Sequence, residues 1–137
     1  MIVVDASAML EWLLQAEAAE VVEKRLFDPE QMVHAPHLID VEIAHALRRS
    51  VLKGELDPVR GGEALADLAD FPMYRYPHDM LLPRIWELRN NLTAYDASYV
   101  ALAETLEAAL LTSDRRLAAA AGHHARIELV LPATAAW

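Results

Sequence analysis

The sequence predicts an α/β fold, a three-layer α/β/α sandwich around a central parallel sheet. Short apolar runs typical of buried strands alternate with longer segments whose apolar residues recur at helical spacing. Strands separated by helices imply parallel pairing, and the right-handed crossover rule places helices on both faces of the sheet. No repeat, low-complexity linker or break in composition divides the chain, so a single domain over residues 1–137 is expected.

The composition narrows the class of protein. The chain has 137 residues, of which 55% are hydrophobic, so it can form a substantial core and is not disordered. No apolar run approaches the roughly 18 residues that cross a bilayer, and a cytoplasmic protein with no membrane partner is expected. Cysteine is absent, so any metal must bind through oxygen or imidazole. The six histidines show no metal-ligand spacing and are expected at the surface.

The first half of the chain alternates between strand and helix patterns with clear stop signals. We expect a strand at 2–5, helices at 7–14 and 18–27, a strand at 32–35, and helices at 38–53 and 58–70. The pair Asp28-Pro29 stops the second helix, and Gly54 ends the long third one. Asp57 followed by Pro58 is typical of a helix start, with proline at the first helical position.

The second half repeats the alternation. We expect a strand at 73–76, helices at 77–91 and 94–108, a strand at 109–112, an alanine-rich helix at 114–121 and a last strand at 127–131. Pro77 opens the first of these helices and Thr93 the second. After the first strand, the run at 109–112 is the strongest strand pattern in the chain.

Four carboxylates occupy corresponding positions in these elements. Asp5 and Asp114 follow strands, whose carboxyl ends are where α/β folds place ligands, and Glu42 and Asp96 lie in early turns of helices. This placement indicates a metal-binding acidic pocket. Each of Asp5, Asp96 and Asp114 also has a local explanation as a helix cap or a favourable charge near a helix start. Glu42 has apolar helical neighbours and therefore needs a partner.

Asp40 competes with Glu42 for a place in this pocket. Its helical neighbours are just as apolar, and the sequence pattern alone does not separate the two. Two positions apart on a helix means about 200° of rotation, so only one of them can face the pocket. Asp40 lies in the first turn, where the helix terminus gives it an alternative role.

The charge of the chain is unusual for a protein that binds nucleic acid. The formal net charge of −9 argues against simple charge-driven binding, although acids that hold divalent cations explain part of it. Arg49 lies two turns after Glu42 on the same helix face and could contact a phosphate or a site carboxylate. Arg115 and Arg116 follow Asp114 and are candidates for phosphate contacts, with solvated helix charges as the alternative.

Several segments together resemble a PIN-domain ribonuclease of the VapC toxin type, over essentially the whole chain. They are Val4-Asp5-Ala6-Ser7-Ala8, Glu42 in a helix that follows a proline, Tyr95-Asp96-Ala97-Ser98-Tyr99-Val100-Ala101-Leu102-Ala103, and Leu111-Thr112-Ser113-Asp114-Arg115-Arg116-Leu117. The last two are the most specific because each pairs an acid with a fixed apolar and hydroxyl context.

The resemblance implies a PIN-like fold and a set of site residues. These are Asp5, Glu42, Asp96 and Asp114 as the acidic quartet that binds Mg²⁺ or Mn²⁺, with Ser7 and Thr112 as catalytic hydroxyl helpers. Four gathered carboxylates repel one another unless cations stand between them, and hard divalent ions suit oxygen ligands. The implied function is a metal-dependent endoribonuclease that cuts RNA as the toxin of a toxin–antitoxin pair, with an antitoxin partner and a homodimeric state.

Two other functions fit parts of the sequence. A catalytically weak PIN-fold binding module would keep the fold and act through protein partners, and the acidic net charge slightly favours it. A receiver-type phosphorylation domain also places acids at strand ends. Such a domain resembles a pattern with adjacent acids after the first strand and a lysine after the last, whereas Ala6 follows Asp5 and the only lysines are Lys24 and Lys53.

Overall fold

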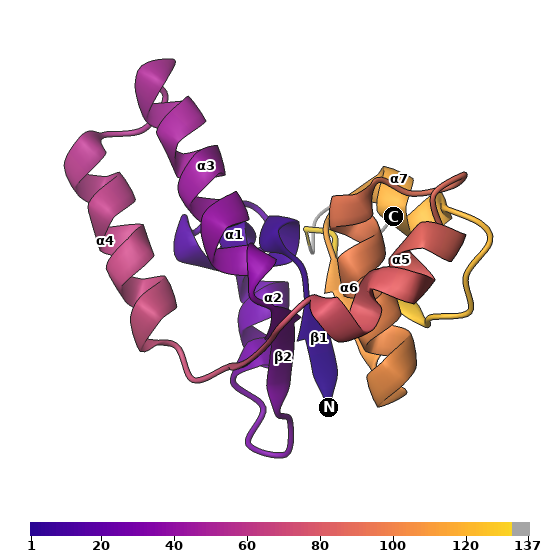
Figure 1. The fold of residues 1–137 in the computed structure, drawn as a ribbon. Coiled ribbons are helices and arrows are strands. Elements are labelled where there is room, and N and C mark those ends of the chain that lie inside the picture. Colours follow the sequence, from indigo (N-terminus) through magenta and orange to yellow (C-terminus); the bar gives the residue numbers. More distant parts are fainter. Residues whose placement is uncertain (133–137) are drawn as a thin grey trace.

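The computed structural model describes residues 1–132, which form a five-stranded parallel sheet with helices around it (Figure 1). The strands are β1 (Ile2–Val4), β2 (Val33–Pro36), β3 (Tyr74–Tyr76), β4 (Ala109–Thr112) and β5 (Ile127–Leu129). Their order across the sheet is β3-β2-β1-β4-β5, and every neighbouring pair is parallel. The predicted α/β/α sandwich is therefore confirmed.

Seven α-helices and one 3₁₀ turn connect the described strands. They are α1 (Ala6–Leu13), α2 (Ala19–Leu26), α3 (Leu38–Leu52), α4 (Pro58–Asp70), η1 (Asp79–Leu81), α5 (Leu82–Glu87), α6 (Ala94–Leu106) and α7 (Arg115–Ala119). The single helix predicted at 77–91 is shorter than expected and is split into η1 and α5. Pro83, which lacks an amide donor, lies in the first turn of α5, where no intrahelical bond is lost.

The core lies on both faces of the two central strands. All residues of β1 and β4 are buried, as predicted for strands covered on both sides. On one side α1 contacts α2, α3 and α4, whereas α6 contacts α5 and the strands β1, β2 and β4. Burial of each Val, Leu or Ile side chain in such a core stabilises the fold by about 1.5–3 kcal/mol.

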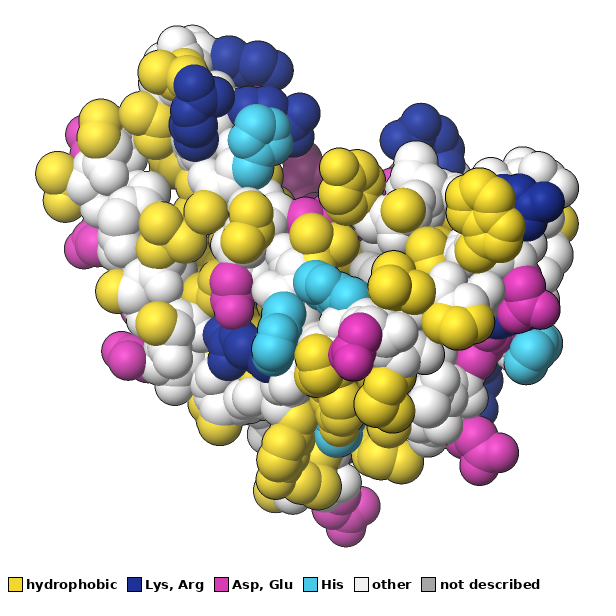
Figure 2. All heavy atoms as spheres, viewed as in Figure 1, with side chains coloured by type: hydrophobic (Ala, Val, Ile, Leu, Met, Phe, Trp, Pro, Cys, Tyr) yellow, Lys and Arg dark blue, Asp and Glu magenta, His cyan; other side chains and the backbone are white. Residues whose placement is uncertain are grey.

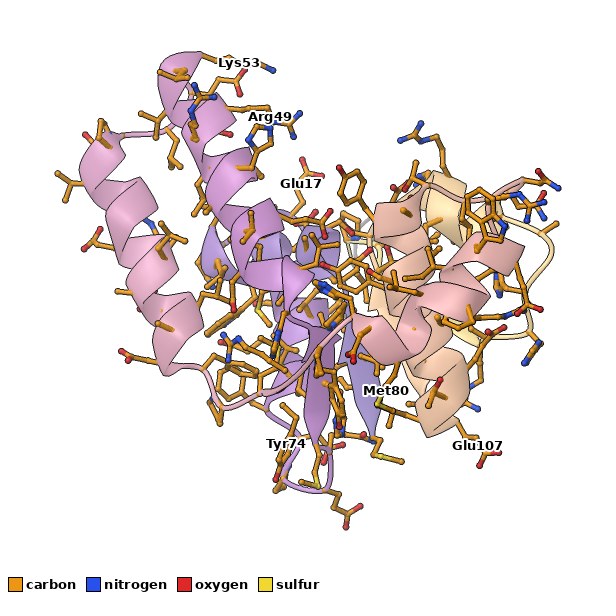
Figure 3. The ribbon with its side chains drawn as sticks, in the orientation of Figure 1. Glu17, Arg49, Lys53, Tyr74, Met80 and Glu107 are labelled. Atoms are coloured by element: carbon orange, nitrogen blue, oxygen red, sulfur yellow. The ribbon has the colours of Figure 1, made fainter. Side chains whose placement is uncertain are left out.

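The helices α3 and α4 form a hairpin that extends from the rest of the fold, at the left of Figure 1. Gly54 follows α3 with a φ of 75°, a left-handed conformation that glycine adopts without a steric cost. Asp57 caps α4 by accepting a hydrogen bond from the Val59 amide at 2.7 Å. The free end of this hairpin carries Arg49 and Lys53 (Figure 3).

The sheet has a topological switch point between β1 and β4. From β1 the chain proceeds outward through β2 to β3, then crosses back to place β4 on the other side of β1. Val4 and Leu111 are register partners, so the residues that follow β1 and β4 emerge next to each other. In open α/β sheets this crevice at the carboxyl ends of the strands is the usual ligand site.

One expectation about the histidines is wrong. His34 is only 5% exposed, because it lies in the interior strand β2, where side chains of both faces are covered. Its Nδ1 lies 2.6 Å from the hydroxyl of Tyr76, and burial lowers its pKa. Within the part of the chain that is described, no helix has the length and apolar character needed to cross a bilayer. A single domain over residues 1–137 stays a prediction.

Candidate acidic site

Asp5 lies at the carboxyl end of β1, and both of its carboxylate oxygens accept hydrogen bonds. Its Oδ1 accepts hydrogen bonds from the Ala8 amide at 2.9 Å and from the Ser7 hydroxyl at 2.7 Å. Its Oδ2 accepts one from the Thr112 hydroxyl at 2.5 Å. Asp5 therefore caps α1, which is the role that its position before a helix predicts, and it is also hydrogen-bonded to Thr112 of β4.

The hydroxyls of Ser7 and Thr112 join the ends of β1 and β4. Thr112 Oγ1 accepts a hydrogen bond from the Asp114 amide at 3.0 Å, and Ser7 Oγ accepts one from the Ser113 amide at 3.0 Å. The two hydroxyl oxygens lie 3.2 Å apart. Ser7 and Thr112 therefore hold both the Asp5 carboxylate and the turn that carries Asp114 in position.

The structure separates Asp40 from Glu42. The carboxylate of Asp40 forms two hydrogen bonds, of 2.8 and 3.0 Å, with the guanidinium of Arg75 on β3. Glu42 is half-buried on the other side of α3 and accepts a hydrogen bond from the hydroxyl of Tyr99 on α6. Of the two alternatives that the sequence left open, Glu42 is the one that faces the other acids.

Asp96 lies in the first turn of α6, after the capping residue Thr93. The Thr93 hydroxyl accepts a hydrogen bond from the Asp96 amide at 3.1 Å, so the predicted capping arrangement is present at the backbone. The Asp96 carboxylate is half-buried. It interacts electrostatically with Asp5, Glu42 and Asp114, and is the group that the other three share.

Three of the four carboxylates have raised pKa values, chiefly because they are withdrawn from water. Burial raises the pKa of Asp5 from its ordinary 3.8 to about 6, against the opposing hydrogen bonds of Thr112, Ala8 and Ser7. Burial also raises the pKa of Glu42, opposed by the Tyr99 hydroxyl and increased by Asp96. The pKa of Asp96 rises through burial and the charge of Asp114, with Arg116 and Thr93 acting in the opposite direction.

We call the set Asp5, Glu42, Asp96 and Asp114 the acid pocket. Figure 2 shows the surface hollowed between the free end of α3 and the side formed by α6 and α7. Among residues 1–132, no group of three or more His, Asp or Glu side chains is close enough to hold a metal ion jointly. The acids are thus electrostatic neighbours and not a preassembled ligand set.

The donor chemistry of the acid pocket nevertheless fits a hard divalent cation. All four side chains offer carboxylate oxygens, and within residues 1–132 none of them forms an ion pair. The second oxygens of Glu42 and Asp114 accept no hydrogen bond from the described residues. Negative charge that the protein itself leaves uncompensated is what Mg²⁺ or Mn²⁺ would neutralise.

The three arginines predicted to contact phosphates are all exposed. The charge of Arg116 lowers the pKa of Asp96, so this side chain is within electrostatic reach of the pocket. Arg115 is exposed on the same helix, α7. Arg49 is exposed on α3 and projects toward the side of the molecule that carries α6 (Figure 3).

Tyr99 is the site residue that the sequence interpretation missed, because an aromatic residue in an apolar helix is expected to pack in a core or an interface. The ring is buried with 1% exposure, but its hydroxyl is the hydrogen-bond partner of Glu42. Burial, followed by the Glu42 carboxylate, raises the pKa of Tyr99, which therefore stays a donor at neutral pH. A signal was available, since Tyr99 lies three residues after Asp96 and shares its helix face.

Comparison with known proteins gives one family. A family model described as the PIN domain matches residues 2–123. Ribonuclease VapC1 of Mycobacterium tuberculosis is 46% identical over 129 residues, which cover 93% of this chain and 96% of the relative. Ribonuclease VapC9 of the same organism is 50% identical over 117 residues, covering 85% and 88%.

A solved structure has the same fold. A chain in the crystal structure of VapBC2 from Rickettsia felis, bound to a DNA fragment from their promoter, superimposes with a TM-score of 0.69 at 11% identity. The match covers 95% of this chain and 99% of the other.

Proposed function

This chain belongs to the PIN domain family and, within it, to the VapC ribonucleases, and we propose that it is a metal-dependent endoribonuclease, the toxin of a type II toxin–antitoxin pair. The observation that carries this proposal is the acid pocket, in which Asp96 interacts with the other three carboxylates at the switch point of the sheet. Its substrate is RNA, which it cleaves at phosphodiester bonds in the cytoplasm.

Asp5, Glu42, Asp96 and Asp114 are the residues that would hold Mg²⁺ or Mn²⁺. When bound, the cation supplies positive charge that offsets the repulsion of the carboxylates and polarises the phosphodiester. The hydroxyls of Ser7 and Thr112 keep the Asp5 carboxylate in one orientation.

The remaining polar residues position the substrate and Glu42. The Tyr99 hydroxyl donates to Glu42 and fixes the carboxylate against the rotation of its long side chain. Arg49, Arg115 and Arg116 contact phosphates on either side of the cut. Arg116 lies close enough to Asp96 to affect its pKa, and so has the strongest support of the three.

The proposed partners are a cognate antitoxin and a second copy of this chain. The support for an antitoxin is the similarity to VapC relatives and to a chain of the VapBC2 complex. An antitoxin that places a cationic group in the acid pocket would block the carboxylates electrostatically.

Substitution of a single carboxyl oxygen in the acid pocket tests the proposal. Asp96→Asn keeps the size of the side chain and removes its charge, and we expect cleavage of RNA with Mg²⁺ or Mn²⁺ to fall about 10²- to 10³-fold. Glu20→Gln, an exposed acid in the first turn of α2, is the matched control and should retain activity. Induced expression should arrest growth with the wild type and the control only. Full activity of a folded Asp96→Asn protein would reject the assignment.

A second candidate function is a catalytically weak binding module that acts through protein partners. The net charge of −9 and the lack of a preassembled metal site among residues 1–132 favour it. Calorimetric titration with Mn²⁺ distinguishes the two. Binding that disappears in Asp96→Asn supports the nuclease, whereas no binding at millimolar Mn²⁺ supports the module.

A further inference from the structure

A groove of about 420 Å³ opens beside the acid pocket, between the first half of α3 and the start of α6. It is lined by Leu38, Val41, Glu42, His45 and Tyr95. Its volume lies in the range of about 300–1,000 Å³ typical of small-ligand sites. Glu42 belongs both to this groove and to the acid pocket, so the two are continuous.

Two apolar side chains of the groove are left in water. Tyr95 is 61% exposed and Val41 69% exposed, and within residues 1–132 the Tyr95 hydroxyl forms no hydrogen bond. Tyr95 immediately precedes Asp96 in the first turn of α6. Because Tyr95 and Glu42 line the same groove, a flat group stacked on the Tyr95 ring would lie beside one acid of the acid pocket.

Polar and charged side chains continue from the groove along α3. On α3, Glu42, His45 and Arg49 succeed one another at spacings of three and four residues and so share one helix face. Figure 2 shows Lys and Arg side chains gathered over the free end of α3, next to a histidine. Along this face the Glu42 carboxylate is followed by the His45 imidazole and then by the Arg49 guanidinium.

We propose that this groove binds one nucleobase of the RNA strand next to the scissile phosphate, with the base stacked on Tyr95. The inference rests on the proposed nuclease function. Stacking on an aromatic ring is independent of net charge, and so provides affinity for RNA to a protein with a charge of −9. His45 lies at the groove to meet the polar edge of the base, which makes Tyr95 and His45 specificity-determining residues.

Binding is tested without cleavage. In the Asp96→Asn background, an oligoribonucleotide of mixed sequence that contains 2-aminopurine is titrated and its fluorescence followed. We expect Tyr95→Ala to weaken binding about tenfold, and Tyr95→Phe to restore it because the ring is retained. Trp86→Ala is the matched control, since this ring is 66% exposed on α5 outside the groove, and its affinity should be unchanged. Equal affinity of Tyr95→Ala and the parent, or no binding by the parent, would overturn the proposal.

Cleavage of a random-sequence RNA pool gives the second test. In Tyr95→Ala we expect KM to rise about tenfold with little change in kcat, and the base preference to relax at one position beside the cut. Unchanged KM and base preference would contradict the groove while leaving the nuclease intact. The opposite result, binding that depends on Tyr95 without any cleavage by the wild type, would reject the nuclease and keep the groove as a base-binding site.

Discussion

The two ends of α6 carry carboxylates in opposite electrostatic states. At the amino end, Asp96 lies among other acids, and burial together with the charge of Asp114 raises its pKa. At the carboxyl end, Glu104 is held by two hydrogen bonds of 2.8 and 3.0 Å from the Arg84 guanidinium, and its pKa is lowered despite burial.

The difference separates a structural carboxylate from a functional one. Glu104 also accepts a hydrogen bond from the His124 amide at 2.9 Å, so it ties α5, α6 and the segment before β5 together. Its charge is balanced by that of Arg84. The acids of the acid pocket have no ion-pair partner among residues 1–132, which costs stability and leaves attraction for a cation.

The largest expected effect comes from removing the ion pair between Arg84 and Glu104 at the carboxyl end of α6. Arg84→Met removes the partner of Glu104, whose side chain is 6% exposed, and we expect the free energy of unfolding to fall by about 3 kcal/mol. Urea denaturation at pH 7 measures this loss. Arg25→Met, which breaks the more exposed pair with Glu128, should cost less than about 1 kcal/mol. Equal losses in the two variants would show that burial does not distinguish the pairs.

The acid pocket should instead respond to pH. The folded-state pKa of Asp5 is raised to about 6, above an unfolded value near 3.8, so the folded protein binds the extra proton between these values. Its contribution is fully present below about pH 3.8 and is lost as pH rises through 6, which amounts to roughly 2–3 kcal/mol. Glu104 has the opposite sign, because its lowered pKa adds stability above its unfolded pKa. Urea titrations of wild type and Asp5→Asn in chelator across pH 4 to 7 isolate the Asp5 term as their difference. A difference that does not change with pH would contradict the raised pKa.

Neutralising the shared acid should stabilise the protein. Asp96→Asn removes the repulsion with Asp5, Glu42 and Asp114, and we expect a gain on the order of 1 kcal/mol at pH 7 without metal. Thermal unfolding with and without Mg²⁺ measures it, and Mg²⁺ should raise the Tm of the wild type more than that of the variant. A lower Tm for metal-free Asp96→Asn would mean that its carboxylate supports the fold.

The smallest effect is expected for Glu87, the more exposed of the two acids that lie near Arg84. Glu87 lies 3.8 Å from Arg84 and is 65% exposed, so Glu87→Gln should change the unfolding free energy by less than about 0.5 kcal/mol. The same urea assay applies. A loss as large as that of Arg84→Met would place the stabilising charge on Glu87 and not on Glu104.

The sequence predicts which strands and helices carry the site residues better than it predicts the contacts between their side chains. Asp5 and Asp114 follow apolar runs that are typical of buried strands, so their positions follow from local pattern and the parallel pairing rule. The choice between Asp40 and Glu42 depends on Arg75, 35 residues along the chain from Asp40, and no local pattern contains it. Tyr99 escaped because an aromatic residue in an apolar helix satisfies the core pattern and the hydrogen-bond role equally well.

The hydrogen bond from the Thr112 hydroxyl to Asp5 joins residues 107 positions apart, so formation of the site depends on how much of the chain has been synthesised. A nascent chain that still lacks β4 has no acid pocket, whatever part of it has already folded. The four acids of this pocket can therefore come together only after the chain has been synthesised through Asp114.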